Sequence, residues 1–221
     1  MKVTIIVGGK FHAFNLAKEL NDNGFLKEII TSYPSYSINK YKINKRKVKS
    51  IIFKEILLKI LNKIPFVKDN FDIDYFLCNY FSLKASKKID FENLNIIIGW
   101  SSFSKETFIK AKKYNCIKIL ERGSTHIEFQ KKILNDEFNK LNLKPYLPSN
   151  KLIQKELEEY ELADYIVVPS EFARKTFIEY GINENKIIKI PYGVDLNEFK
   201  PLDISRIKGD KFRIICTGTL S

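Results

Sequence analysis

Short apolar runs alternate with longer helical patterns along this chain, and that alternation constrains the fold more than any other feature. The first run, Val3 to Val7, is rich in β-branched residues, which favour strands, and it ends at Gly8-Gly9. A helical pattern follows from about Phe11 to Asn23, and Gly24 ends it. This order is typical of an open, mostly parallel sheet with helices on both faces. The sequence therefore predicts an α/β fold.

The same alternation continues to residue 190. Further strands are expected at Lys27–Ser32, Leu94–Ile98, Cys116–Leu120, Tyr165–Val168 and Lys186–Ile190. Further helices are expected at 50–64, Asp72–Ile89, Ser104–Tyr114, Glu128–Leu141, Lys151–Ala163 and 170–181, with Ser104 and Ser170 as N-caps and Phe103 and Phe108 as a hydrophobic staple. Leu94 to Ile98 is apolar throughout, which indicates a strand buried on both faces.

Polar and aromatic residues gather where several of these strands end. In open parallel sheets, ligands bind at the carboxyl ends of the strands. That edge receives both histidines and the single tryptophan of the sequence, as parts of Gly8-Gly9 with His12, Trp100, the segment Arg122–His126 and Ser170. We therefore predict a binding site at this edge.

Gly8-Gly9 is the first candidate element of the site. Glycine lets the backbone approach a ligand closely, and the following helix N-terminus favours an anion such as phosphate. The run is no G-x-G-x-x-G dinucleotide motif, because position 11 is Phe11. A glycine pair can equally form a simple tight turn, so both interpretations stay open.

The loop after the strand Cys116–Leu120 carries the candidate catalytic residue, His126. Arg122 in the same loop suits a phosphate or carboxylate, and Ser124 adds a hydroxyl. No serine lies in a nucleophile-elbow pattern. The alternative is that His126 only caps a helix or lies on the surface. The predicted binding residues are Gly8, Gly9, His12, Trp100, Arg122 and Ser124.

Positive charge is concentrated in one part of the chain. The net charge is +12, and between Asn39 and Lys68 ten Lys or Arg residues accompany one acid, Glu55, whereas 156–164 is acidic. The helix expected at 50–64 has an apolar face, Phe53, Ile56, Leu57, Ile60, Leu61 and Ile64, opposite Lys54, Glu55, Lys59, Asn62 and Lys63. This composition is typical of an element that binds an anionic membrane surface. The alternative is an ordinary helix with its apolar face on the sheet and its lysines in solvent.

Other classes of partner and cofactor are not expected. The lysines lack interleaved aromatic residues or a recognition module, so nucleic acid is not a predicted partner. Two histidines and the separate cysteines Cys78, Cys116 and Cys216 provide neither a metal-binding pattern nor a disulfide framework. The cysteines suggest reduced thiols in a cytoplasmic protein, and no run is long enough to span a membrane.

Two stretches resemble the family 4 glycosyltransferases. Glu161 to Phe172 reads Glu-Leu-Ala-Asp-Tyr-Ile-Val-Val-Pro-Ser-Glu-Phe, and Ile190 to Pro201 reads Ile-Pro-Tyr-Gly-Val-Asp-Leu-Asn-Glu-Phe-Lys-Pro. The second stretch is similar to the segment at which that family crosses from one Rossmann-like domain to the next. Phe212 to Ser221 looks like the first strand and turn of the second, donor-binding domain.

The resemblance implies a GT-B fold and a retaining transfer of a sugar from a nucleotide-sugar donor to a glycan or lipid-linked acceptor. No metal or other cofactor is expected. His126 would hydrogen-bond the donor sugar, and Gly8 and Gly9 would approach the donor diphosphate or the acceptor. Trp100 and Arg122 are added from their place at the edge of the sheet. The expected location is the cytoplasm, with peripheral contact at the inner face of the membrane.

The resemblance also implies a domain division. Residues 1–200 would form the N-terminal, acceptor-side domain, and 201–221 a linker and the first strand of the donor domain. The family's Glu-x7-Glu signature and its nucleotide-binding Arg and Lys belong to the donor domain, after the last residue of this sequence, so we expect no transfer by this chain alone. The alternatives are a non-catalytic module that binds an acceptor or a membrane, and one half of a split enzyme.

Overall fold

The computed structural model describes residues 1–61, 63–64, 72–194, 196, 199–200 and 214. The chain divides into two compact units, Met1–Pro191 and Tyr192–Ser221. The predicted boundary near residue 200 falls within the second unit. The strand predicted for Phe212–Ser221 lies, apart from Ile214, outside the described residues.

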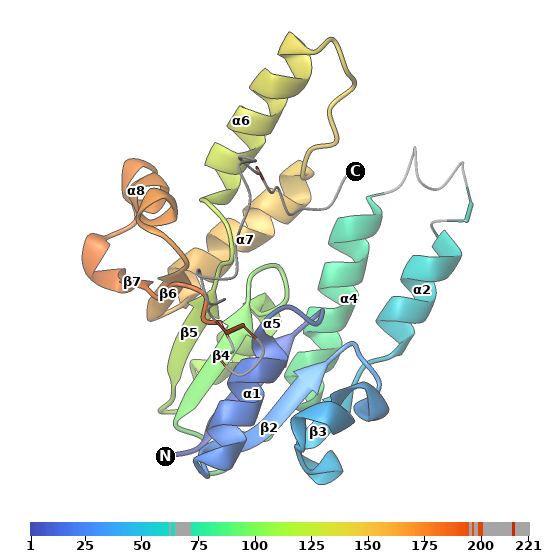
Figure 1. The fold of residues 1–221 in the computed structure, drawn as a ribbon, viewed down its shortest axis with the longest axis vertical. Helices are drawn as coiled ribbons and strands as arrows, with labels where there is room; N and C mark the ends of the chain where they lie inside the picture. The colour runs from blue at the N-terminus through green and yellow to red at the C-terminus, as the bar shows by residue number, and fades with distance from the viewer. Residues whose placement is uncertain (62, 65–71, 195, 197–198, 201–213, 215–221) are drawn as a thin grey trace, which may run out of the picture. The chain divides into compact units, whose positions relative to one another are not determined.

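The first unit contains a sheet of seven parallel strands in the order β3-β2-β1-β4-β5-β6-β7 (Figure 1). The strands are β1 (Val3–Val7), β2 (Leu26–Thr31), β3 (Val48–Ser50), β4 (Ile96–Trp100), β5 (Ile117–Glu121), β6 (Tyr165–Val168) and β7 (Ile187–Lys189). The strand order reverses between β1 and β4. The predicted α/β class, a Rossmann-like parallel sheet with helices on both faces, is confirmed.

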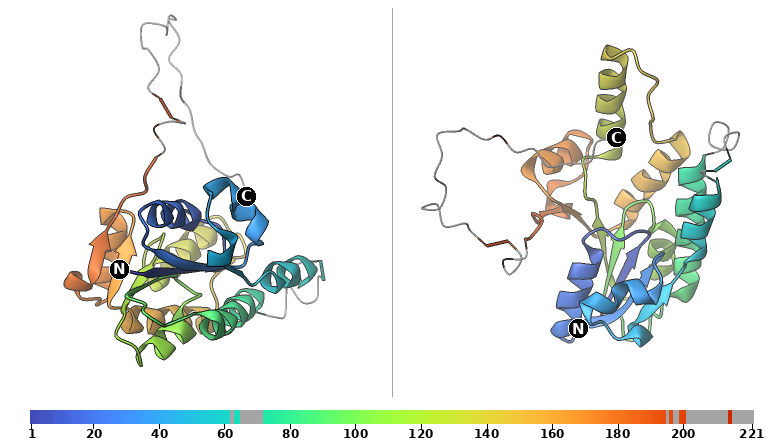
Figure 2. Two further views of the ribbon diagram at one scale, coloured as in Figure 1. Left: turned by 90° about the horizontal axis from the view of Figure 1, so that it is seen from below. Right: turned by 45° about the vertical axis from the view of Figure 1, so that its right-hand side comes forward.

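Helices cover both faces of this sheet. The α-helices are α1 (Ala13–Asp22), α2 (Phe53–Leu61), α4 (Ile73–Lys88), α5 (Lys105–Ala111), α6 (Ile127–Lys140), α7 (Asn150–Leu162) and α8 (Glu171–Glu179), and the 3-10 turns are η1 (Ser35–Tyr41), η2 (Lys45–Lys47) and η3 (Glu184–Lys186). Seen along the sheet, α1 and η1 lie on one face and α4 lies on the other (Figure 2). Among the described residues, no helix combines the length and the apolarity needed to cross a membrane.

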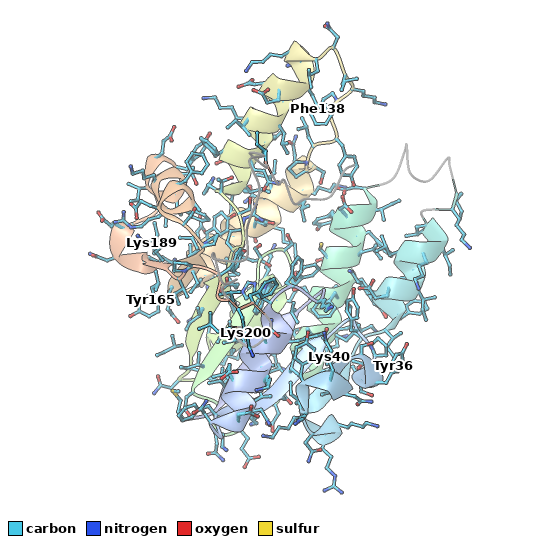
Figure 3. The ribbon with its side chains drawn as sticks, viewed as in Figure 1. Tyr36, Lys40, Phe138, Tyr165, Lys189 and Lys200 are labelled. Carbon is cyan, nitrogen blue, oxygen red and sulfur yellow. The ribbon has the colours of Figure 1, made fainter. Side chains whose placement is uncertain are left out.

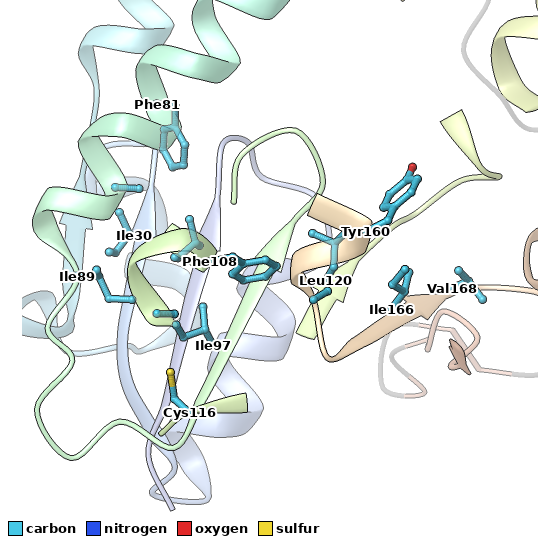
Figure 4. Close-up of a cluster of buried hydrophobic side chains, with 14 of the residues drawn as sticks. Ile30, Phe81, Ile89, Ile97, Phe108, Cys116, Leu120, Tyr160, Ile166 and Val168 are labelled. Atoms are coloured by element: carbon cyan, nitrogen blue, oxygen red, sulfur yellow. The ribbon is translucent and has the colours of Figure 1, made fainter. Parts of the chain in front are cut away.

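Two hydrophobic cores join these layers, because a strand buried on both faces needs an apolar partner on each. The smaller core places Phe14 of α1 and Ile38 of η1 against Ile5 and Ile29. The larger core joins the other face of the sheet to α4, α5, α7 and α8 through Phe81, Phe108, Tyr160 and Phe177 (Figure 4).

The region after β2 differs from the prediction. Val48–Ser50 forms the edge strand β3, which pairs with Ile29–Thr31, and the helix expected at 50–64 begins only at Phe53. Strand β3 is short and polar, so hydrophobic periodicity gives little signal for it. The pairing is supported by Lys49, whose Nζ lies 2.5 Å from the buried carboxylate of Glu28 on β2.

Each edge strand carries a lysine. Lys49 lies on β3, and on β7 the side chain of Lys189 reaches Glu171 of α8 with its Nζ 3.2 Å from Oε2 (Figure 3). A charged side chain on an edge strand disfavours the addition of another strand. Both ends of the sheet are therefore protected against edge-to-edge association.

The close approach of α5 to β4 depends on Gly99. A Cβ at this position would lie 2.2 Å from Ser104 Oγ and 2.7 Å from Ser104 Cβ, and Ser104 Oγ donates a hydrogen bond of 2.8 Å to the carbonyl of Trp100. We expect Gly99→Ala to lower the free energy of unfolding by about 1–3 kcal/mol, since the helix must move away from the strand. Urea denaturation measures this. Gly193→Ala is the control, because no described atom lies within 4 Å of a Cβ built there. An unchanged denaturation midpoint for Gly99→Ala would contradict this account.

Candidate functional site

The carboxyl ends of β1, β4 and β5 lie side by side at the point where the strand order reverses. In doubly wound sheets this reversal opens the crevice in which ligands bind. Gly8 follows β1, Trp100 ends β4, and Glu121 ends β5, with Arg122 next in the chain. Most of the predicted site residues therefore lie at the point where the strand order reverses.

His12, Trp100 and Glu121 form the centre of this arrangement. His12 precedes α1, and its Nε2 lies 3.1 Å from Oε1 of Glu121. The His12 ring lies 5.1 Å from the Trp100 ring, centroid to centroid. The His12 side chain is 34% exposed and that of Glu121 only 8%, so a buried carboxylate orients an imidazole that solvent reaches. A group of this kind can hydrogen-bond or exchange a proton with a hydroxyl. The sequence named Trp100 and His12 as binding residues. For Glu121 it left open whether the carboxylate orients a base or only caps the strand.

Gly8 is enclosed by protein atoms. Its carbonyl oxygen accepts a hydrogen bond from Lys54 Nζ at 2.9 Å and lies 3.0 Å from Ser32 Oγ. A Cβ at Gly8 would lie 2.2 Å from the Phe103 ring, which packs edge-on against Phe81. Packing alone therefore accounts for a glycine at this position. The approach of Gly8 and Gly9 to a ligand stays a prediction.

Lys54 is a contact that sequence reasoning missed. The helical pattern placed Lys54 and Glu55 on the polar face, opposite the apolar one, and gave them no contact with the sheet. In the structure the Lys54 side chain is 12% exposed and reaches the end of β1. Glu55 accepts a hydrogen bond of 2.5 Å from Ser32 Oγ. The N-terminal turn of α2 therefore contributes charged groups to the same edge of the sheet as Gly8.

Arg122 is held by several partners at once. Its Nε donates to the carbonyl of Thr125 at 3.1 Å, and its Nη2 donates to Gln130 at 2.6 Å. Its Nη1 lies 3.3 Å from Ser101 Oγ and 3.2 Å from Oε2 of Glu156. These bonds fix the loop after β5 against the loop after β4. The predicted role of Arg122 in binding an anion stays a prediction.

His126 lies apart from the His12 cluster. It is the N-cap of α6, with Nδ1 accepting from the backbone N–H of Glu128 at 3.4 Å. The ring is 1% exposed, and Tyr180 stacks on it at 4.7 Å, while Tyr160 and Phe177 lie at 5.1 and 5.2 Å. Ser124 is half-buried in the same loop.

Burial makes the neutral form of His126 the stable one. Desolvation and the nearby charge of Arg122 lower its pKa from 6.5 to about 4. A neutral imidazole that accepts at Nδ1 carries its proton on Nε2. At neutral pH, His126 is therefore a hydrogen-bond donor through Nε2 and carries no charge.

A buried face of α7 supports both loops of the site. Glu159 is 0% exposed, and its carboxyl group accepts three backbone N–H bonds, from Ser102 at 2.6 Å, Ser104 at 2.7 Å and Lys105 at 2.9 Å. Glu159, and not the side chain of Ser104, satisfies the N-terminus of α5, which corrects the predicted cap. Burial and the neighbouring Glu156 raise the pKa of Glu159 to about 8.

Glu156 is the second buried acid of α7. It accepts from Ser102 Oγ at 2.5 Å and from the Tyr160 hydroxyl at 2.9 Å, and it pairs with Arg122. Ser102 has a left-handed backbone, with φ of 73°, which a non-glycine residue rarely adopts. Glu156 and Glu159 hold it there from two sides, so the loop after β4 has one defined conformation.

The sequence offered one signal for this network. Lys155, Glu156, Glu159 and Tyr160 fall on one helical stripe with the apolar Leu152 and Ile153, and the structure buries that stripe. Among the described residues, no group of three or more His, Cys, Asp and Glu side chains could hold a metal ion.

Removing the Glu159 carboxyl group tests the support that α7 gives. Glu159→Ala leaves three N–H groups without an acceptor in a buried place, so we expect the free energy of unfolding to fall by about 3 kcal/mol or more. Denaturant titration measures the change. Glu158→Ala, one residue away in a surface pair with Lys105, should cost about 1 kcal/mol or less. Equal effects of the two variants would show that Glu159 has no special role.

The buried His126 predicts a dependence of stability on pH. Because its pKa falls from 6.5 to about 4 on folding, its contribution is present above pH 6.5 and is lost as the pH falls through 4. In His126→Phe the aromatic contacts remain and the titration disappears. We expect the free energy of unfolding of the wild type to fall more steeply between these pH values than that of His126→Phe. Glu128→Gln is the control, and parallel curves for wild type and His126→Phe would refute the assignment.

Comparison with known proteins agrees with this geometry. The sequence profile of Glycosyltransferase Family 4 matches residues 6–198. No curated protein sequence matches the chain. Solved structures of similar fold include one from Listeria monocytogenes described as a UDP-N-acetylglucosamine 2-epimerase (11% identity, TM-score 0.52, covering 89% of this chain and 50% of that chain). Another is UDP-GlcNAc 2-epimerase from Neisseria meningitidis bound to UDP-GlcNAc (9% identity, TM-score 0.51, covering 86% of this chain and 45% of that chain). A UDP-glucosyltransferase from Polygonum tinctorium also matches (11% identity, TM-score 0.48, covering 87% of this chain and 52% of that chain).

These structural likenesses show the fold alone, and the chain spans about half the length of the solved structures that it matches. The sheet order of the present chain is that of a Rossmann-like α/β domain. The profile match extends from β1 through β7. This chain therefore belongs to Glycosyltransferase Family 4.

Proposed function

We propose that this chain takes part in the transfer of a sugar from a nucleotide-sugar donor to an acceptor, with retention of the anomeric configuration. The observation that carries the proposal is the cluster of His12, Trp100 and Glu121 at the reversal of strand order in a family 4 chain. The Neisseria meningitidis protein of similar fold binds UDP-GlcNAc, which supports a nucleotide sugar as the donor.

The first unit is proposed to bind the acceptor, and the donor nucleotide would be bound largely by a second Rossmann-like domain. The acceptor is a glycan or a lipid-linked sugar, and the reaction needs no metal. A lipid-linked acceptor places the protein in the cytoplasm with contact at the inner face of the membrane.

His126 is proposed to bind the donor sugar. Its Nε2–H would donate a hydrogen bond to the sugar and stabilise charge that develops as the glycosidic bond breaks. The ring is 1% exposed among Tyr180, Tyr160 and Phe177, so its surroundings would have to rearrange before a sugar could reach Nε2. Tyr180, which stacks on the ring, follows α8 directly as its C-cap.

The remaining site residues have complementary proposed roles. Gly8 and Gly9 precede α1, whose N-terminus would favour the donor diphosphate or an anionic acceptor. His12, oriented by Glu121, would bind an acceptor hydroxyl, and Trp100 would support the imidazole. Arg122 and Ser124 would bind donor or acceptor oxygens.

Nucleotide release from UDP- and GDP-sugars tests this function. The chain is assayed alone and joined to the donor domain of a family 4 relative, and the anomeric configuration of the product is determined by NMR. We expect turnover in the fusion, with retention. His126→Phe keeps the aromatic contacts but removes Nε2–H, so kcat should fall about 100-fold or more, as for loss of a hydrogen-bond donor at the reacting group.

Two controls make this result specific. Asn139→Ala alters an exposed residue of the same helix, α6, and should leave kcat unchanged. Circular dichroism shows whether each variant is folded. A folded fusion that binds glycan or vesicles but has no turnover would replace the transferase with the binding-module alternative.

A further inference from the structure

Helix α2 presents its apolar face to solvent. None of its residues, Phe53 to Leu61, is buried. The exposed fractions are 51% for Phe53, 46% for Ile56 and 50% for Ile60, and Ile52 and Ile64 before and after the helix are each 41% exposed. The spacing of these residues places them on one side of the helix.

The opposite side of α2 is anchored by polar contacts. Lys54 donates to the carbonyl of Gly8 at 2.9 Å and lies 2.9 Å from Glu55, which accepts from Ser32 at 2.5 Å. These bonds fix the rotation of the helix about its axis. The alternative in which the whole apolar face packs on the sheet is therefore wrong, because Phe53, Ile56 and Ile60 are exposed, although Leu57 and Leu61 of that face are half-buried.

The apolar surface continues onto α4, which runs beside α2 at the end of the unit opposite β7 (Figure 1). The rings of Phe53 and Tyr80 lie 5.8 Å apart, and on α4 Phe76 and Leu83 are 39% and 44% exposed. The α2 face is defined here as Ile52, Phe53, Ile56, Ile60 and Ile64 together with Phe76 and Leu83. Exposed apolar side chains gathered on two neighbouring helices are typical of an interaction site.

Lysines lie within and beside the α2 face. Lys59 and Lys63 are exposed on α2 and just after it, and on α4 Lys84 is exposed with its Nζ 5.7 Å from the Tyr80 ring. Apolar side chains bordered by cations complement a lipid surface with anionic head groups, since lysine stems reach along the apolar region while their amines contact the head groups.

We infer that the α2 face docks on an anionic lipid bilayer, with its apolar side chains at the depth of the head groups and the lysines around them on lipid phosphates. The inference identifies the surface by which the protein contacts the membrane. It rests on the proposed function only for the purpose of that contact, which is to bring the candidate site to a lipid-linked acceptor. Charge favours this occupant over a second copy of the chain, because two copies would bring like charges together.

Co-sedimentation with vesicles tests the inference without any sugar donor, so the result is separate from that of the transfer assay. The complete chain is mixed with vesicles of phosphatidylcholine alone and of phosphatidylcholine with about one-third phosphatidylglycerol. We expect binding to the anionic vesicles to be at least about tenfold tighter than to the neutral ones and to weaken with salt.

Two variants separate the apolar and the charged contributions. Ile56→Ser with Ile60→Ser removes two exposed apolar groups and should weaken binding to anionic vesicles about tenfold or more. Lys59→Glu with Lys63→Glu should have an effect of similar size and should also reduce the dependence on salt. All four residues are exposed, so thermal unfolding should be unchanged.

Matched controls come from other helices. Ile133→Ser with Ile178→Ser alters isoleucines of α6 and α8 that are 44% and 36% exposed, and Lys112→Glu with Lys113→Glu alters two exposed lysines after α5. Wild-type binding by these controls together with loss in the α2 variants supports the inference. No vesicle binding by the wild type, or equal losses in the controls, overturns it. A dimer in sedimentation velocity that Ile56→Ser with Ile60→Ser abolishes, without an effect on vesicle binding, overturns it in favour of a second copy.

Discussion

The carboxyl group of Glu159, with no exposure to solvent, is the interaction on which the edge of the sheet depends. It accepts hydrogen bonds from the backbone N–H groups of Ser102, Ser104 and Lys105. Those of Ser104 and Lys105 lie at the N-terminus of the short helix α5, which has no partner for them within the helix. Glu156, about one turn before Glu159 on α7, pairs with Arg122 and so connects Arg122 to the same loop. Buried acids are costly unless they are hydrogen-bonded, and here each bond also fixes a loop. Helix α7 is thus as much a part of the site's construction as the strands are.

The fixed loops explain why the crevice has a definite geometry. The conformation of the Trp100–Ser104 segment places the Trp100 ring beside His12, while the buried end of β5 places Glu121 on the other side of the same imidazole. Neither partner lies near His12 in the sequence, so the imidazole is oriented only when the sheet is complete. The environment of His126 is assembled in the same way, from α6, α7 and α8.

The sequence was sufficient for the fold class and for six of the seven strands of the sheet, because the signals for these are local. Apolar runs marked β1, β4 and β6, and parallel strands require long connections, which the helical patterns supply. The short, polar β3 gave no such signal. The site could be predicted only as a set of loops. Burial of Glu159 depends on donors that lie 55 residues earlier, and the side on which α2 packs depends on a carbonyl that lies 46 residues earlier. Periodicity shows that a helix has two faces, but it cannot show which of them meets the protein.

Helix α2 has different surroundings on its two sides, because its exposed isoleucines stand across the axis from Lys54, whose amine donates to the Gly8 carbonyl. Thermodynamic linkage applies to these two sides: a ligand on the outer side that changes the free energy of binding at the end of β1 is itself bound more tightly or more weakly by the same coupling free energy when the end of β1 is occupied. Lys54 is thus the residue through which the end of β1 and the outer surface of the unit are connected.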